Sequence, residues 1–155
     1  MKAQTKENRP GGPAGEIEVR IADWSDDKPD IRRIRTLVFI EEQKIPEDEE
    51  FDDADKTAVH VLAYNDLGEA IGTARLLGSK KIGRVAVVKS WRGKGVGKAL
   101  IGFLMQMARE NGAHTVELDA QVYAIPFYER LGYRVTGGEF MDAGIPHRKM
   151  SIEFS

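Results

Sequence analysis

The sequence predicts an α+β fold: a single domain built on a twisted, mixed β-sheet of about six to seven strands flanked by helices. Several short segments alternate apolar and polar residues, as half-buried strands do, and others repeat apolar residues at helical spacing. The expected order is β-α-β-β-β-α-β-α-β-β, in which a run of hairpins precedes a strand-loop-helix-strand unit. In that unit, a right-handed crossover through 95–112 would place a strand at 114–120 parallel to one at 82–88.

The first half of the chain predicts four strands and one helix. Residues 16–22 alternate as a strand does, 57–64 and 70–77 are joined through a turn-forming Asn-Asp-Leu-Gly, and 80–88 follows by another hairpin. A helix is expected between the first two strands, with Asp27 or Asp30 as its N-cap and an end near Gln43. Its expected buried face comprises Ile31, Ile34, Leu37 and Val38.

The second half predicts a long helix, a short helix and three strands. A glycine-rich loop at 92–98 opens the long helix, which Asn111-Gly112 should end. One face of this helix is apolar: Val96, Leu100, Phe103, Leu104 and Met107. The remaining expected elements are strands at 114–120, 133–137 and 148–154 and a helix at 124–131.

Composition excludes several classes of protein. With 41% apolar and 31% charged residues the chain is an ordinary globular one, and its net charge of −2 gives no basic field for nucleic acid or an anionic membrane. It has no cysteine, which excludes disulfides, thiol nucleophiles and thiolate metal sites and fits a reducing cytoplasm. Residues 1–15 are expected to be a disordered tail and 16–155 the functional domain. We therefore expect a cytoplasmic protein without a metal.

The stretch "RGKGVGKAL" (92–100) predicts an anion-binding site. A nucleotide P-loop would need glycine at 92 and Ser or Thr after Lys98, but Arg92 and Ala99 stand there. The dinucleotide pattern G-x-G-x-x-G also fails, because the glycines here are spaced G-x-G-x-G. Backbone amides and the positive end of a helix dipole nonetheless favour a phosphate at such a loop.

Two motifs in order resemble the GNAT N-acetyltransferase superfamily. The strand "GRVAVVKSW" followed by Arg92-x-x-Gly95-x-Gly97 and an amphipathic helix is similar to its acyl-CoA pyrophosphate loop, and "YAIPFYERLGYRV" (123–135) resembles its second signature. The match extends over 16–154. It implies that acetyl-CoA is the cosubstrate and that a primary amine attacks the thioester directly. The compact size and short loops favour a small-molecule acceptor, and a protein lysine or N-terminus is the alternative.

The resemblance also assigns residues to the acetyl-CoA site. The pyrophosphate would lie on the loop formed by Arg92, Gly93, Lys94, Gly95, Val96, Gly97 and Lys98. Pantetheine would bind as an extra strand between two splayed strands, with the Val85 amide on the thioester carbonyl and the Val87 amide on pantetheine. Tyr128, next to Phe127, would donate a proton to the CoA sulfur. Gln121 occupies a position where many relatives have Asn, and is expected to bond pantetheine or neighbouring backbone.

The general base has several candidates. A free alkyl amine has a pKa of about 10, so a group must accept its proton at neutral pH. His147, in an expected loop near the acceptor side, is preferred, because free histidine titrates near pH 6.5. The alternatives are the carboxylates Glu42, Glu117 and Asp119 or a water chain. His60 is expected to be structural and His114 to be an incidental surface residue.

The acidic stretch at 47–55 has seven carboxylates in nine positions. It is expected to be a solvated loop; alternatively it attracts a cationic acceptor, whereas the spacing of an EF-hand calcium loop is missing. The C-terminal "RKMSIEFS" could pair two copies as a homodimer. Two non-enzymatic hypotheses stay open at this point: an acyl-CoA sensor that does no chemistry, and an interaction module that grips a partner's phosphate.

Overall fold

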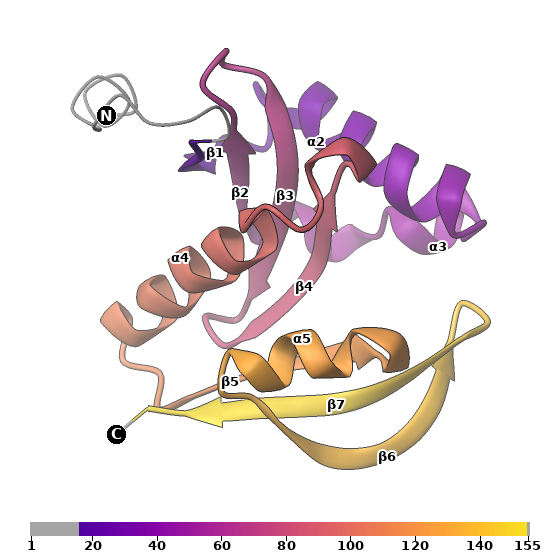
Figure 1. The fold of residues 1–155 in the computed structure, drawn as a ribbon, viewed down its shortest axis with the longest axis vertical. Coiled ribbons are helices and arrows are strands. Elements are labelled where there is room, and N and C mark those ends of the chain that lie inside the picture. The colour runs from indigo at the N-terminus through magenta and orange to yellow at the C-terminus, as the bar shows by residue number, and fades with distance from the viewer. Residues whose placement is uncertain (1–15, 155) are drawn as a thin grey trace.

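The structure, a computed structural model, describes residues 16–154 and confirms the predicted mixed sheet (Figure 1). Seven strands follow the order β1-β2-β3-β4-β5-β7-β6. The elements, in chain order, are β1 (Glu18–Ala22), α2 (Lys28–Arg35), the π-helix η1 (Thr36–Glu42), α3 (Glu47–Glu50), the 3₁₀-helix η2 (Asp53–Lys56), β2 (Val59–Tyr64), β3 (Ala70–Leu77), β4 (Lys81–Val87), η3 (Lys89–Trp91), α4 (Val96–Glu110), β5 (Thr115–Gln121), η4 (Val122–Ala124), α5 (Ile125–Arg130), β6 (Arg134–Asp142) and β7 (Ile145–Glu153). The predicted tail lies outside the described residues.

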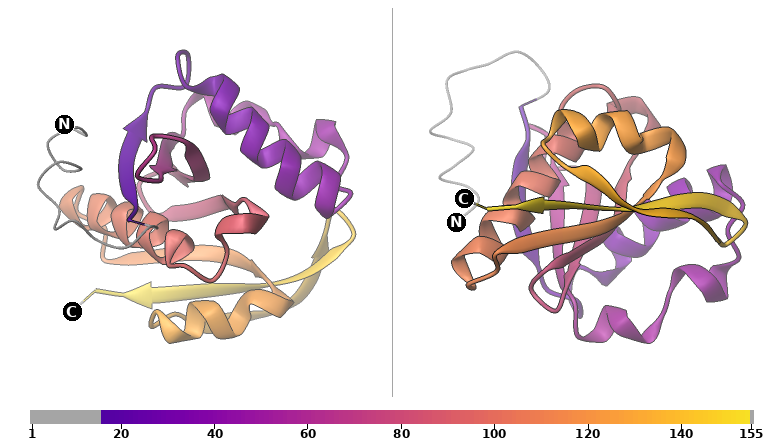
Figure 2. Two further views of the ribbon diagram at one scale, coloured as in Figure 1. Left: turned by 45° about the horizontal axis from the view of Figure 1, so that its top comes forward. Right: turned by 90° about the horizontal axis from the view of Figure 1, so that it is seen from below.

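Helices cover both faces of the sheet, α4 and α5 on one and α2 and α3 on the other (Figure 2). Strand β2 shows why two layers form, because its buried residues alternate between the faces. Val61 packs in the cluster beneath α4, and its neighbour Leu62 packs in the cluster beneath α2. Both side chains have no exposed surface. The core is therefore two apolar layers divided by the sheet.

The first helix begins as predicted but changes pitch after its second turn. Asp27 occupies the N-cap position, and after Arg35 the helix continues as a seven-residue π-helix. The Gln43 N–H donates to the Val38 carbonyl at 3.2 Å, a step of five residues. This wider turn buries Val38 and Phe39, whereas Leu37, expected on the buried face, is 37% exposed. That part of the prediction was wrong.

The last hairpin, formed by β6 and β7, is longer than predicted, and this has two consequences. Strand β7 already begins at Ile145, so His147 lies in a strand and not in a loop. Pro146 is tolerated because the β5–β7 pairing ends at Gln121 and His147, which leaves one edge of β7 unpaired there. Further along, β7 is paired on both sides, with β5 and β6, so its middle has no unpaired edge within the described chain, and the homodimer through "RKMSIEFS" stays a prediction.

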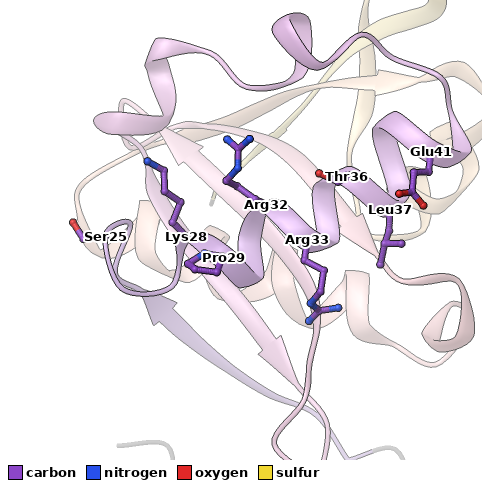
Figure 3. Close-up of a pocket in the computed structure, with 8 residues that line it drawn as sticks. All are labelled: Ser25, Lys28, Pro29, Arg32, Arg33, Thr36, Leu37 and Glu41. Atoms are coloured by element: carbon purple, nitrogen blue, oxygen red, sulfur yellow. The ribbon is translucent and has the colours of Figure 1, made fainter.

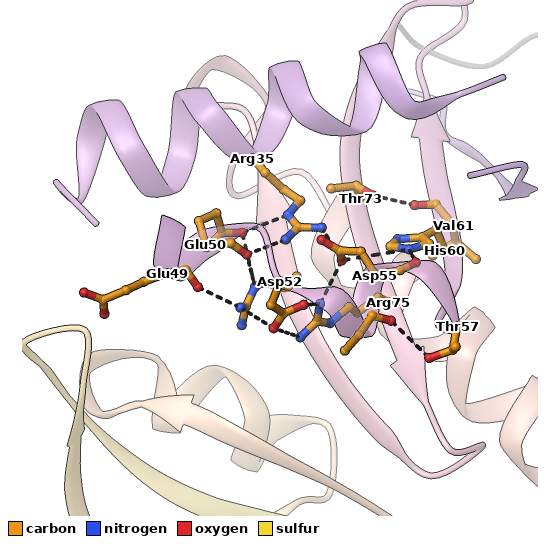
Figure 4. A network of polar contacts seen from close by, with 12 residues as sticks. Arg35, Glu49, Glu50, Asp52, Asp55, Thr57, His60, Val61, Thr73 and Arg75 are labelled. Atoms are coloured by element: carbon orange, nitrogen blue, oxygen red, sulfur yellow. Dashed lines mark hydrogen bonds and ion pairs between the residues drawn. The ribbon is translucent and has the colours of Figure 1, made fainter. Parts of the chain in front are cut away.

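The acidic stretch, here called the acidic segment (Glu47–Asp55), is not a solvated loop. It folds into α3 and the start of η2, and both Glu50 and Asp55 are buried, each with 2% exposure. Arg35 bonds the two carboxylates at 2.8 Å each, and Arg75 bonds Asp55 at 2.7 Å (Figure 4). The alternation-based prediction missed this because the cationic partners come from α2, β3 and β4, far away in the sequence.

His60 lies at the edge of this cluster and fits the expected structural role. Its side chain is buried, its ring stacks on Trp24 with centroids 4.4 Å apart, and its Nε2–H donates to the Asp55 carbonyl at 2.9 Å. Burial lowers the pKa of this imidazole, an effect that outweighs the nearby Asp55. His60 is therefore held neutral in the folded protein.

We expect this neutral histidine to make folding pH-dependent below about pH 6.5, where the unfolded chain binds a proton at His60 and the folded chain does not. Between pH 7 and 5 the free energy of unfolding should fall, by at most about 1.4 kcal/mol per pH unit from this group. Urea unfolding of the wild type, His60→Gln and the exposed-histidine control His114→Gln checks this. His60→Gln should lose part of the pH dependence of the free energy of unfolding, and His114→Gln should lose none of it. If the free energy of unfolding falls equally with pH in all three proteins, the prediction is wrong.

Candidate active site

Strands β4 and β5 are parallel, as predicted, but they pair over only two residue pairs. These pairs are Lys81 with Glu117 and Ile82 with Leu118. From Gly83 onward β4 is hydrogen-bonded along its β3 edge alone among the described strands. The other edge therefore presents backbone N–H and C=O groups that need partners from elsewhere.

A β-bulge occurs in β4 where the two strands part. Gly83 pairs with Arg75 and Ala86 with Thr73, so that Arg84 and Val85 together stand opposite the single residue between them on β3. The bulge reverses the alternation of the strand. Ile82 packs in the cluster beneath α4, but Ala86, four residues on, packs in the cluster beneath α2.

The bulge gives Val85 and Val87 two roles at once. Both side chains are half-buried and pack against the cluster beneath α4. Their backbone belongs to the stretch of β4 beyond its pairing with β5. The side chains of Val85 and Val87 therefore hold the strand in the core. Their backbone amides, which are the predicted binding groups, lie on the stretch of β4 that β5 does not pair with.

The glycine-rich loop leads from β4 into the N-terminus of α4. Gly95 takes the left-handed conformation, with φ of 90°, and the helix begins at the buried Val96. Gly97 meets another constraint, since a Cβ there would lie 3.2 Å from Cζ of Phe127, which is closer than an ordinary van der Waals contact. Glycine at 97 thus lets α4 approach α5 closely, and the free amides of the first turn of α4 lie at the end of β4.

Arg92 is already engaged by protein groups. Its Nε–H donates to the Val87 carbonyl at 2.9 Å, and both of its terminal nitrogens bond the Glu42 carboxylate. The hydrogen bond from Arg92 lowers the pKa of Glu42. Glu42 is therefore held ionised as the partner of Arg92, which makes it a poor general base. Lys94, whose Nζ lies 5.3 Å from the Trp91 ring centroid, and Lys98 provide further charge at the loop.

Tyr128 lies on α5 beside the helix that the loop opens. It is 9% exposed, and its ring makes edge contacts with Phe127 and Tyr133, with centroids 5.0 and 5.9 Å away. Burial raises the pKa of this phenol far above its usual value. Tyr128 therefore stays protonated at neutral pH and can act as a hydrogen-bond donor.

On the other face of β5, polar side chains from three segments come together. Gln121 faces His147 across the β5–β7 ladder and exchanges two hydrogen bonds with Gln43, of 2.9 and 3.4 Å. His147 Nδ1 lies 2.7 Å from the Ile145 carbonyl, so Nδ1 carries the proton and Nε2 is the acceptor of the neutral ring. Phe140 stacks on that ring at 5.8 Å. Sequence reasoning missed Gln43, because only the π-helix aims it at β5.

The other candidate bases are placed less favourably. Glu117 is paired with Lys149 at 3.4 Å and Asp119 with Lys81 at 2.9 Å. His114 is exposed before β5. Among residues 16–154, no group of His, Asp or Glu side chains could hold a metal ion, and no helix is long and apolar enough to cross a membrane.

A surface depression of about 600 Å³ lies along α2 and η1 (Figure 3). It is lined by Ser25, Lys28, Pro29, Arg32, Arg33, Thr36, Leu37 and Glu41. None of these residues comes from β4, the glycine-rich loop, β5 or α5. The depression is therefore separate from the strands and the loop that were predicted to bind acetyl-CoA.

Comparisons with known proteins agree with this geometry. Residues 35–154 match the acetyltransferase (GNAT) domain family. The uncharacterized N-acetyltransferase YjcF of Bacillus subtilis is 40% identical over 121 residues, 76% of this chain and 86% of that protein. A glucosamine 6-phosphate N-acetyltransferase of Trypanosoma brucei brucei is 37% identical over 84 residues, 48% of this chain and 57% of that protein.

A solved structure gives the same fold along nearly the whole described chain. The acyl-CoA N-acyltransferase of Pseudomonas aeruginosa superposes with a TM-score of 0.77 at 27% identity, covering 88% of this chain and 99% of its own. Family, relatives and fold thus agree with the resemblance found in the two motifs. The chain belongs to the GNAT acetyltransferase family and is an acyl-CoA-dependent N-acetyltransferase.

Proposed function

We propose that the enzyme transfers an acetyl group from acetyl-CoA to a primary amine of a small molecule by direct attack on the thioester. The observation that supports this most strongly is the unpaired edge of β4, which is followed, after η3 and the glycine-rich loop, by the N-terminus of α4. A ligand with amides at one end and a pyrophosphate at the other would satisfy both features. Acetyl-CoA is such a ligand.

The chain's own groups divide the binding task. The Val87 amide would hold pantetheine, and the amides of Gly93 to Lys98 would hold the pyrophosphate, with Lys94 and Lys98 adding charge. Arg92 would act by fixing the loop, since its guanidinium already joins the Val87 carbonyl to Glu42. Phe127 would complete the wall of the site where it meets Gly97. Gln121 would contribute by positioning Gln43 and the end of β5.

The reaction needs one group to accept a proton and another to donate one. His147 Nε2 would take the proton of the attacking amine, with Nδ1–H held by the Ile145 carbonyl. The Val85 N–H would stabilise the oxyanion that forms as the C–N bond is made. As the C–S bond breaks, the protonated Tyr128 would donate to the thiolate. Tyr128 has this role in the protonation state that its burial favours.

The acceptor is a primary amine in this proposal, and one relative suggests its size. The trypanosomal relative is named for glucosamine 6-phosphate, a small amino sugar. In contrast, three carboxylates of the acidic segment, Glu50, Asp52 and Asp55, are bound to arginines and are not free to attract a cation. We therefore favour a small amine without a requirement for multiple positive charges.

Acyl-CoA binding can be tested by thermal unfolding with acetyl-CoA, CoA, ATP and NAD side by side. At about a hundredfold excess over Kd, binding to the folded state alone should stabilise it by about 2.7 kcal/mol. We expect a rise in Tm with the two CoA species that is much reduced in Lys98→Glu and retained in Lys56→Glu, a surface control on η2. An equal rise with ATP, or none with CoA, would contradict the proposal.

The role of His147 can be tested by substitution. In His147→Gln, kcat should fall by about 10²- to 10⁴-fold, because the amine loses its proton acceptor. Thiol release with a panel of primary amines, including amino sugar phosphates, measures this. His114→Gln is the matched control and should behave as the wild type does. Full activity in His147→Gln would assign the base to another group.

A further inference from the structure

We propose that Arg84 is a positioning residue: its guanidinium, clamped by the acidic segment, fixes the β4 bulge that aims the Val85 N–H into the gap between β4 and β5. The inference rests on the proposed function, because Arg84 would act only through Val85. It also assigns a role to the acidic segment. The proposed binding of acyl-CoA and the proposed proton transfers do not use the carboxylates of this segment.

The backbone of Arg84 provides the first observation. Its φ is 51°, in the left-handed region that side-chain-bearing residues rarely adopt. The other such residues in the described chain, Lys44, Ser79 and Ala143, lie outside helices and strands. Glycine would take this conformation without strain, as it does next to the bulges of many strands. An arginine at this position therefore implies that its side chain holds the bulge in place.

The side chain provides the second observation. Arg84 Nε donates to the Glu50 carbonyl at 3.1 Å and lies 3.2 Å from the Glu50 carboxylate. Nη2 donates to the Glu49 carbonyl at 3.3 Å and to Asp52 Oδ2 at 3.2 Å. One guanidinium thus bonds three residues of the acidic segment, Glu49, Glu50 and Asp52, and a planar fork of donors suits such a task.

The acidic segment is itself anchored on the far side (Figure 4). Arg35 of α2, which is 1% exposed, bonds both the carboxylate and the carbonyl of Glu50, at 2.8 and 2.7 Å. Arg75 of β3 bonds Asp52 at 2.7 Å. The clamp on Arg84 is therefore attached to α2 and to β3, the strand against which the bulge forms.

Arg84 is bonded directly to Val85, so the dihedral angles at Arg84 set the direction of the Val85 N–H. An oxyanion donor must be aimed at the position where charge develops, and a misplacement of about 1 Å can cost about 10²-fold in rate. Loosening the clamp should therefore weaken the contact with the thioester carbonyl and leave the glycine-rich loop intact. This separates Arg84 from residues that only bind acyl-CoA.

The test is isotope-edited infrared spectroscopy of carbonyl-labelled acetyl-CoA bound to the enzyme. A hydrogen bond from Val85 polarises the thioester carbonyl and lowers its stretching frequency. In Arg84→Gly, which permits the left-handed backbone and removes the clamp, we expect a smaller downshift with acetyl-CoA still bound. Turnover of any accepted amine should fall by about tenfold or more. Arg84→Lys keeps the charge but lacks the planar fork of donors. It should show a smaller decrease in the carbonyl downshift and in turnover than Arg84→Gly.

A matched control is Arg134→Gly, another strand arginine that pairs with a carboxylate, Glu153 at 3.6 Å, but lies on β6. It should give the wild-type frequency. A wild-type frequency in folded Arg84→Gly and Arg84→Lys would overturn the inference and leave the proposed function intact. If Arg84→Gly does not fold, Arg84→Lys decides. No downshift in the wild type with acetyl-CoA bound would overturn the role of Val85, and the inference with it.

Discussion

The early parting of β4 from β5 is the constraint on which the rest of the site depends. A sheet interior normally pairs every backbone group, and here pairing stops after two residue pairs. The bulge in β4 begins at the same point and reverses which residues face α2. The strand then delivers the chain to the N-terminus of α4. The unpaired groups of β4 and the free amides at the start of α4 thus follow one another along the chain from this bulge.

The cluster of arginines and carboxylates behind this strand fixes the positions of the elements that it joins. Its formation removes charged groups from water, which is unfavourable. Burying charges is expensive, and a buried pair that loses one partner is strongly destabilising, so such a cluster is weak evidence for high stability. Its members nevertheless come from α2, the acidic segment, β3 and β4, and each charge meets an opposite one. The cluster therefore joins α2 to β4, the strand that carries Val85.

Much of the fold could be predicted from the sequence, because alternation and helical spacing are local signals. Strand β3 was predicted to the residue, and the parallel β4–β5 pair followed from crossover handedness. The bulge, the π-helix and the long final hairpin could not be predicted. The bulge and the π-helix occur beside contacts between distant residues, Arg84 with Glu50 and Gln43 with Gln121, and β7 of the hairpin pairs with β5, which comes before α5.

The candidate site was predicted unevenly for the same reason. The glycine-rich loop and Tyr128 belong to continuous motifs, and the structure brings them together through the contact of Gly97 with Phe127. The proposed base differs, because His147 was expected in a loop and lies in β7 opposite Gln121. The engagement of Arg92 with Glu42 could not be foreseen either, since fifty residues separate them. Local motifs therefore carry the prediction of the acyl-CoA side, and the proposal for the acceptor side depends on the tertiary structure.

The central claim is that acyl-CoA lies along the unpaired edge of β4. Backbone ¹⁵N–¹H NMR of the protein titrated with CoA tests it most directly, because it reports on the amides themselves. We predict that the largest shift changes occur at Val85, Val87 and the amides of the glycine-rich loop. Binding that shifts other amides and leaves Val85 and Val87 unmoved would contradict the account.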